Sequence, residues 1–191
     1  LHVFRSPVGG LFRHVRDLAR SQQGLGHDVG FFCDSSTGGA EASATLQACS
    51  AFCRAGIETM AIPRLPSLAD FGMIRAATGM ARRGGFTIIH GHGAKGGLIA
   101  RMAARKLAIP SVYTPHGGSL HYSWRSLSGA AFLATEKYLA RAGSGFGFVC
   151  EFEKQAFSDK IGLAGKPSVV AHNGLWPDEF EPLTPAPDAT D

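Results

Sequence analysis

The sequence predicts an α/β domain built on a mostly parallel sheet of about seven strands. Short apolar runs alternate with segments of helical periodicity along the chain, and glycines follow several of the predicted helices. No internal repeat occurs beyond this alternation. Strands joined by helices of this length form right-handed βαβ units, which build parallel sheets covered on both faces. We therefore expect a three-layer, Rossmann-like architecture.

The predicted elements alternate from the first residue to the last strand. Strands are expected at 1–4, 28–33, 57–62, 86–90, 111–114, 145–150 and 168–172. Helices are expected at 10–23, 40–54, 67–82, 96–107, 127–141 and 151–162. Glycines suited to helix carboxyl ends follow four of them, at Gly24, Gly56, Gly84 and Gly162. Residues 1–175 are thus expected to form one domain.

The last stretch, 176–191, differs from the rest of the chain. It holds four prolines and loses the periodicity of the preceding segments. Such composition is typical of a linker between domains. We expect it to lead to a second domain.

Composition narrows the class of protein. The 191 residues are 45% hydrophobic and 18% charged, which is typical of a soluble globular chain. No apolar run is long enough to span a membrane, and arginines interrupt any early signal sequence, so a cytoplasmic protein is expected. The net charge of +4 comes without clustered basic and aromatic residues, which argues against nucleic-acid binding.

The four cysteines are expected to be reduced thiols of a cytoplasmic protein. Cys49 and Cys53 fall four residues apart on one predicted helix, a spacing that suits a metal ligand pair. No second pair accompanies them, and we expect no metal there.

The segment "HGHGAKGG" (90–97) fits the pattern G-x-G-x-x-G. A nicotinamide site would need an acidic residue about 20 positions later, whereas the next one after Gly96 is Glu136. The segment also follows the fourth strand rather than the first. An NAD-binding oxidoreductase remains an alternative that these two features disfavour.

The same segment can still bind an anion. Backbone N–H groups at a helix amino terminus attract negative charge, and Lys95 adds a positive one. His90 and His92 flank the turn at the carboxyl end of a strand, where open parallel sheets bind ligands. A tight turn with a solvated lysine explains the residues equally well.

The first strand-to-helix turn, "SPVGG", carries the pair Gly9 and Gly10. Paired glycines let a ligand phosphate approach the backbone and the amino terminus of the following helix. A plain tight turn is the alternative.

The segment "YTPHGGSLHYSW" (113–124) follows the fifth strand. His116, beside Gly117 and Gly118, lies where a histidine can reach a substrate, or bonds only within its own loop. His121 and the aromatic residues after it can stack on a sugar ring or serve packing alone.

These motifs together resemble the amino-terminal half of a family 4 glycosyltransferase, a retaining enzyme with two Rossmann-like domains in the GT-B architecture. The resemblance runs through "SPVGGLFRHVRDLA", "IIHGHGAKGG", "SVYTPHGG", "FVCEFE" and "AHNGLWPDEFEPL". It implies that residues 1–175 are the acceptor-side domain and that 176–191 lead to a donor-binding domain.

The resemblance also implies residue roles. His116 matches the histidine that faces the reacting sugar, and Gly9 and Gly10 match the pair beside the donor diphosphate. The acceptor side of the cleft matches His90, His92, Lys95, Gly117, Gly118 and His121. The family binds the nucleotide-sugar mainly through an E-x₇-E pair, and no two glutamates here have that spacing.

The implied activity is transfer of a sugar from a nucleotide-sugar to a glycan or lipid-linked acceptor, in bacterial cell-surface polysaccharide synthesis. No cofactor or metal is implied, because backbone amides and basic side chains neutralise the leaving diphosphate. This chain alone is expected to be inactive. A free-standing carbohydrate- or phosphate-binding module remains the other alternative.

The segment 64–85 mixes apolar residues with arginines. Such a helix can rest on the inner face of an anionic membrane. More often it covers a sheet.

Overall fold

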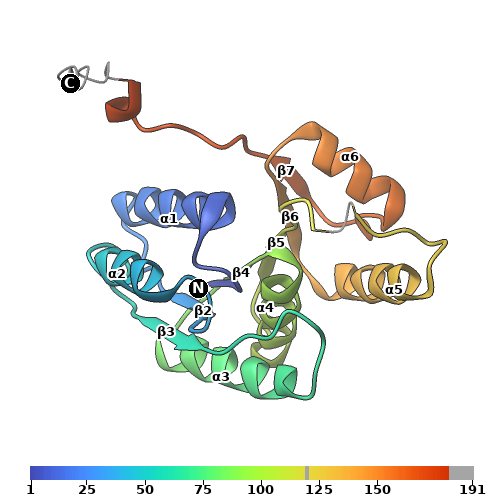
Figure 1. The fold of residues 1–191 in the computed structure, drawn as a ribbon, viewed down its shortest axis with the longest axis horizontal. Coiled ribbons are helices and arrows are strands. Elements are labelled where there is room, and N and C mark those ends of the chain that lie inside the picture. Colours follow the sequence, from blue (N-terminus) through green and yellow to red (C-terminus); the bar gives the residue numbers. More distant parts are fainter. Residues whose placement is uncertain (119–120, 181–191) are drawn as a thin grey trace, which may run out of the picture.

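The computed structural model describes residues 1–118 and 121–180 (Figure 1). Its sheet has seven strands in the order β3-β2-β1-β4-β5-β6-β7, and every neighbouring pair is parallel. The order reverses at β1, between β2 and β4. The predicted three-layer α/β fold is therefore confirmed, with a fully parallel sheet.

The strands are short and the helices span two to four turns. The strands are β1 (His2–Phe4), β2 (Phe31–Asp34), β3 (Ile57–Met60), β4 (Ile89–His92), β5 (Ser111–Thr114), β6 (Gly145–Phe148) and β7 (Ser168–Val170). The helices are α1 (Gly9–Gly24), α2 (Gly39–Cys49), α3 (Ala69–Arg83), α4 (Gly93–Leu107), α5 (Leu127–Ala142) and α6 (Glu151–Lys160), followed by a 3₁₀ turn, η1 (Pro177–Phe180).

The two faces of the sheet carry different helices. Figure 1 shows α1 and α2 on one face and α3 to α6 on the other. This division follows from the strand order, because right-handed crossovers change face when the chain reverses direction across the sheet. On the first face α1 covers β1 and the neighbouring edge of β4, where His90 and His92 lie.

Apolar side chains at alternate strand positions fill both interfaces. Phe4 and Phe31 pack against Phe12 and Val15 of α1. Val3 and Phe32 face the opposite way, into a cluster with α3 and α4. A third cluster joins Tyr113, Phe146 and Phe148 to α5 and α6. The central strands β1 and β2 are thus buried on both faces, as is typical of a parallel sheet, whereas the edge strands β3 and β7 are only partly covered.

Helix α4 lies unusually close to the sheet. A Cβ atom added to Gly96 would stand 2.3 Å from the carbonyl oxygen of Val3, and one added to Gly97 would stand 2.3 Å from the ring of Tyr113. These distances are shorter than van der Waals contact, so only glycine fits. The glycines of "HGHGAKGG" therefore serve packing: Gly91 lies within β4 and Gly96 within α4, and no loop separates them.

The chain returns to α1 after β7 (Figure 1). Glu179 pairs with Arg13, and the guanidinium of Arg20 lies 4.2 Å from the centre of the Trp176 ring. Part of the predicted linker thus packs on the domain. Residues 181–191 of that linker lie outside the described residues.

The structure also bears on the cysteines and on membrane-spanning helices. All four cysteines are free thiols, and three are buried. Helix α2 ends at Cys49, so Cys53 does not share a helix with it and that expectation was wrong. Among the described residues, no helix has the length and hydropathy needed to cross a membrane.

Candidate functional site

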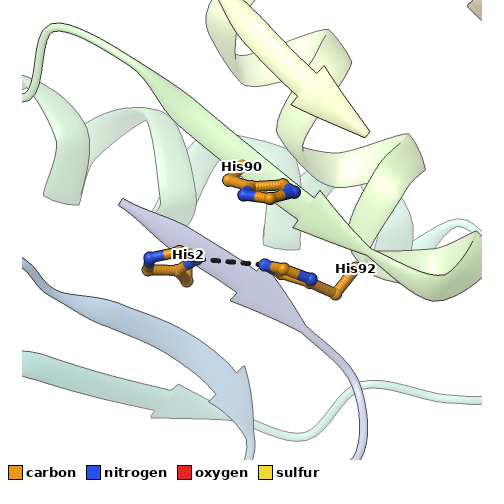
Figure 2. Close-up of side chains that lie close together, drawn as sticks. All are labelled: His2, His90 and His92. Atoms are coloured by element: carbon orange, nitrogen blue, oxygen red, sulfur yellow. Dashed lines mark hydrogen bonds between the residues drawn. The ribbon is translucent and has the colours of Figure 1, made fainter. Parts of the chain in front are cut away.

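Histidines from four segments gather along β1 and β4 and extend to the carboxyl edge of β4 and β5. In the parallel register His2 pairs with His90, and Phe4 with His92. Alternation along each strand therefore turns His2, His90 and His92 toward the same face of the sheet, as Figure 2 shows. Helix α1 covers this face and adds His14, whose ring centre lies 5.9 Å from that of His92.

Hydrogen bonds connect these rings into a chain that ends at the predicted catalytic residue. His2 Nε2 lies 2.8 Å from Gln22 Oε1, and His2 Nδ1 lies 3.0 Å from His92 Nε2 (Figure 2). His92 Nδ1 in turn lies 3.1 Å from His116 Nε2. The chain runs from the buried side of α1 to the half-buried loop after β5.

His90 and His14 have partners of their own. His90 Nε2 lies 2.8 Å from Thr114 Oγ1 on β5. His14 Nδ1 lies 2.7 Å from Asn173 Oδ1 in the segment after β7. Each of the five imidazoles is thus held by a neighbour, so their orientations are set before any ligand binds.

Burial keeps four of these imidazoles neutral, those of His2, His90, His92 and His116. It lowers the pKa of His2 and of His116 to about 3; the amino terminus lowers that of His2 further, and the neighbouring His14 adds to the lowering in both cases. Burial, then the neighbouring histidines, also hold the pKa of His90 and of His92 well below the usual value. A neutral imidazole can accept a hydrogen bond or a metal ion, whereas an imidazolium cannot.

A buried carboxylate fixes the loop that carries His116. His116 and Gly117 have positive φ values of 52° and 73°, a left-handed turn that is rare for a non-glycine residue. Glu153, in the first turn of α6, accepts hydrogen bonds from the backbone N–H of Gly117 and from that of Val149, the latter at 3.1 Å. Gly118 donates its N–H to Pro115 O at 3.3 Å.

The first strand-to-helix turn is open to solvent. Gly9 begins α1 with a φ of 71°, and a Cβ added to Gly9 or Gly10 would meet no atom within 4 Å. No side chain caps the first turn of α1, and no acidic residue lies in it. Its backbone N–H groups therefore have no side-chain acceptor of their own, and an anion can approach them.

Lys95 lies apart from the histidines. Its ammonium is buried between α3 and α4 and lies 2.5 Å from Asp70 Oδ1. The positive charge expected beside the turn is thus matched by a carboxylate from the neighbouring helix. The structure assigns Lys95 an ion pair between two helices, and its predicted place in the cleft stays a prediction.

The rest of the loop after β5 is exposed. His121 lies at the surface, on the far side of residues 119–120, which are outside the described residues. Tyr122 stacks on Phe132 of α5 with ring centres 3.8 Å apart, and Trp124 donates its Nε1–H to Lys160 O at 3.1 Å. Contacts within the domain thus account for the positions of Tyr122 and Trp124.

Several residues of the site were not predicted. His2 and His14 were missed because each stands alone in its segment, and only strand register and helix packing bring them to His92. Glu153 was missed because a carboxylate in a first helical turn is ordinary. The "AHNG" segment was noted, yet nothing in it marks Asn173 as a partner of His14.

A hollow of about 590 Å³ lies at the opposite, amino-terminal edge of the strands. Its lining includes His2, Gln22 and His90 from the inner end of the cluster, together with Leu1, the first residue of the sequence. We assign no ligand to it.

The sequence model of Glycosyltransferase Family 4 matches residues 8–179. The chain belongs to this family. No curated protein matches the sequence. The family 4 match covers both the glycine turn and the His116 loop, and the resemblance stated from the sequence motifs is thereby confirmed.

Solved structures resemble this family 4 chain in fold. The HepE protein of Anabaena, in complex with UDP and glucose, superposes with a TM-score of 0.67 at 18% identity, over 91% of this chain and 44% of that one. Sucrose-phosphate synthase from Thermosynechococcus elongatus gives 0.65 at 15% identity, over 95% and 50%. A glycosyltransferase from Rickettsia africae gives 0.62 at 16% identity, over 96% and 46%. The family 4 chain therefore spans about half the length of these proteins.

Proposed function

We propose that this chain is the acceptor-side domain of a retaining glycosyltransferase that moves a sugar from a nucleotide-sugar to a glycan or lipid-linked acceptor. The family match over residues 8–179 carries the proposal. The half-length coverage of HepE and sucrose-phosphate synthase supports a second, donor-binding domain after the linker at 176–191.

His116 would face the donor sugar from the loop after β5. Its ring is held by His92, and its backbone by Glu153, so the side chain needs little reorganisation to meet the transition state. Gly9 and Gly10 would bring the amino terminus of α1 to the leaving diphosphate, where a helix dipole and free N–H groups stabilise negative charge. Under this proposal the transfer itself uses no metal ion or other cofactor.

The other side of the same edge would receive the acceptor. Two of its residues, His90 and His92, would come from β4. The others would come from the loop after β5: Gly117, Gly118 and His121. Lys95 would contribute indirectly, because its ion pair with Asp70 holds α4 against α3. Bacterial cell-surface polysaccharide synthesis in the cytoplasm is the setting that we propose.

The experiment uses the full-length protein and UDP-glucose, because HepE was crystallised with UDP and glucose. Release of UDP, with and without candidate acceptors, is measured for wild type and His116→Ala. The variant is expected to lose turnover by about a hundredfold, the lower range for a side chain that assists bond cleavage. The exposed His27→Ala serves as the control. Equal turnover of wild type and His116→Ala would exclude this role.

The two-domain arrangement has a simpler test. Reading the gene onward from the codon for Asp191 should reveal roughly 150–200 further residues with a second α/β pattern and an E-x₇-E pair. A stop codon directly after Asp191 would contradict the proposal. Binding of glycans and of nicotinamide cofactors to this chain would then be tested instead.

A lipid-linked acceptor would bring the domain to the inner face of the membrane. Three apolar side chains before and within the first turn of α3 are largely exposed: Leu65 by 73%, Leu68 by 86% and Phe71 by 70%. Arg64 and Arg75 lie exposed beside them. Exposed apolar groups flanked by cations favour an anionic bilayer.

Co-sedimentation with vesicles of an anionic phospholipid tests this contact. Wild type is expected to bind, and Leu68→Ser combined with Phe71→Ser to bind less. Leu127→Ser, at an exposed leucine on α5, is the matched control. Failure of the wild type to bind such vesicles removes the membrane contact from the proposal.

A further inference from the structure

Three imidazoles converge where β4, α1 and the loop after β5 meet. One ring nitrogen from each of His14, His92 and His116 lies within 4.8 Å of the other two. The nearest pair, His92 Nδ1 and His116 Nε2, is 3.1 Å apart. Two nitrogens bound to one tetrahedral zinc ion at about 2.0–2.1 Å stand about 3.3 Å apart. The pair His92 and His116 therefore needs to shift only by tenths of an ångström to share an ion, and His14 has a ring nitrogen within 4.8 Å of both.

The hydrogen-bond chain determines which nitrogen of each ring carries a lone pair. Gln22 Oε1 can only accept, so His2 donates from Nε2 and accepts on Nδ1. His92 must then donate from Nε2 to His2, which leaves the lone pair of its Nδ1 directed at His116. His92 is thus in the tautomer that a metal ligand needs.

His14 is prepared in the same way from the other side. Asn173 Oδ1 accepts from His14 Nδ1, so the lone pair of His14 is on Nε2. Ligating histidines in proteins nearly always donate their second ring N–H to such an oxygen or to another acceptor, which fixes the ring and raises its basicity. Two of the three rings thus have this outer partner.

We propose that His14, His92 and His116 form a binding site for one divalent transition-metal ion of the zinc type, with solvent in the fourth position. Three imidazoles suit zinc, copper or nickel, and they do not suit magnesium or calcium, which prefer oxygen. On binding, His116 coordinates through Nε2, and its proton moves to Nδ1. His116 therefore loses no proton when it binds the ion.

The buried triplet His2, His90 and His92 is the competing location, since its nitrogens also lie within 4.8 Å of one another (Figure 2). There, however, His92 directs an N–H rather than a lone pair at His2, and His90 Nε2 is engaged by Thr114. In the proposed site, by contrast, two of the three rings, His14 and His116, are half-buried at the edge of the domain.

The site has a consequence for catalysis that rests on the proposed function. An ion on His116 Nε2 would replace the hydrogen bond to His92 that holds this ring in place. Metal binding and sugar transfer would then exclude each other, and zinc would act as a reversible inhibitor.

Titration of zinc chloride into the 191-residue chain, prepared without a polyhistidine tag, tests the site directly. Calorimetry is expected to give one ion per chain. His14→Ala should weaken binding by more than a hundredfold, and Asn173→Leu, which removes only the outer partner of His14, by about ten- to a hundredfold. His27→Ala should bind as wild type does. Far-ultraviolet circular dichroism checks that each variant is folded.

Cobalt(II) as a second probe identifies the ligands. A tetrahedral nitrogen site gives visible ligand-field bands, and a thiolate adds a charge-transfer band in the near ultraviolet. Visible bands without the thiolate band support the site. Absence of saturable binding, a thiolate band, or binding that survives His14→Ala and is lost in His90→Ala would each overturn it.

Inhibition is measured separately on the full-length protein. Zinc is expected to slow UDP release from UDP-glucose, a chelator to restore it, and His14→Ala to be less sensitive relative to its own zinc-free rate. Zinc binding without any transfer activity would overturn the proposed function and leave the metal site standing. Transfer that zinc does not affect would overturn the inhibitory role.

Discussion

At the scale of single residues, the position of His116 depends on groups that never reach the cleft. His92 holds its ring and Glu153 holds its backbone. Glu153 is only 3% exposed and spends both carboxylate oxygens on backbone N–H groups. A carboxylate in this place substitutes for backbone partners that a left-handed turn cannot supply.

Replacing Glu153 with Gln is therefore expected to lower stability. The amide nitrogen would face a backbone N–H, and one buried donor would lose its acceptor, at a cost of about 1–3 kcal/mol in the free energy of unfolding. Urea denaturation measures the difference. Glu151→Gln, two residues earlier and paired only loosely with Lys154 at 3.9 Å, is the control and should stay within about 0.5 kcal/mol of wild type. Equal losses of stability in the two variants would contradict the role of Glu153 in holding the His116 loop.

At the scale of the elements, a buried ion pair joins α4 to α5. Arg101 is 0% exposed and binds both oxygens of Glu136, at 3.1 and 3.0 Å. Its guanidinium also lies 4.0 Å from the centre of the Tyr113 ring, and its Nε donates to Gly97 O at 2.8 Å. These contacts fix α4 beside β5, and α4 begins directly after His92.

Breaking this pair on one side should cost more than removing it. Arg101→Met or Glu136→Leu alone leaves an uncompensated buried charge, and each is expected to lose about 3–5 kcal/mol of stability. The double variant should be more stable than either single one, because no charge remains buried. Urea denaturation of the three variants decides. Arg83→Met, which breaks an exposed pair with Glu58, is the control and should cost less than about 1 kcal/mol. A double variant that loses the sum of the two single losses would refute this account.

At the scale of the whole molecule, the histidine cluster couples stability to pH. His2 has a pKa of about 3 in the folded protein, against about 6.5 in an unfolded chain. Between these values the unfolded chain binds the proton and the folded chain does not, so unfolding is favoured as the pH falls. The stabilisation is complete above pH 6.5 and is lost progressively below it.

We expect the free energy of unfolding to decline from pH 7 to pH 5 by up to about 1.4 kcal/mol per pH unit for each buried histidine. His2→Gln should reduce this slope, whatever it does to stability at pH 7, and His27→Gln should leave the slope unchanged. Urea denaturation at several pH values gives the slopes. A free energy of unfolding that rises as the pH falls from 7 to 5 would contradict this prediction.

The fold was predictable because it depends on local periodicity. All seven strands and six helices occur where alternation of apolar runs and helical segments placed them, with boundaries that move by a few residues. The largest change of meaning concerns 90–97, where a motif taken for a turn is a strand joined directly to a helix. Glycine is needed there because α4 packs very close to β1, and the local sequence pattern does not show that distance.

The candidate site was predictable only where a segment is unusual by itself. His116 stands out between a proline and two glycines, and His90 and His92 stand out as a pair. His2, His14, Gln22 and Asn173 have ordinary neighbours in the sequence. Their place in the cluster comes from strand register and from the return of the chain to α1, both of which are properties of the folded molecule.

The position of β1 in the sheet has a consequence for synthesis on the ribosome. Of the seven described strands this one emerges before the others, yet it is central and has β2 on one side and β4 on the other. At about 5–20 residues per second, β4 follows β1 by roughly 4–18 s. Throughout that interval one edge of β1 has no partner, which exposes it to pairing with other nascent chains. The histidine cluster needs both strands, so it can assemble only after β4 has been synthesised and has paired with β1.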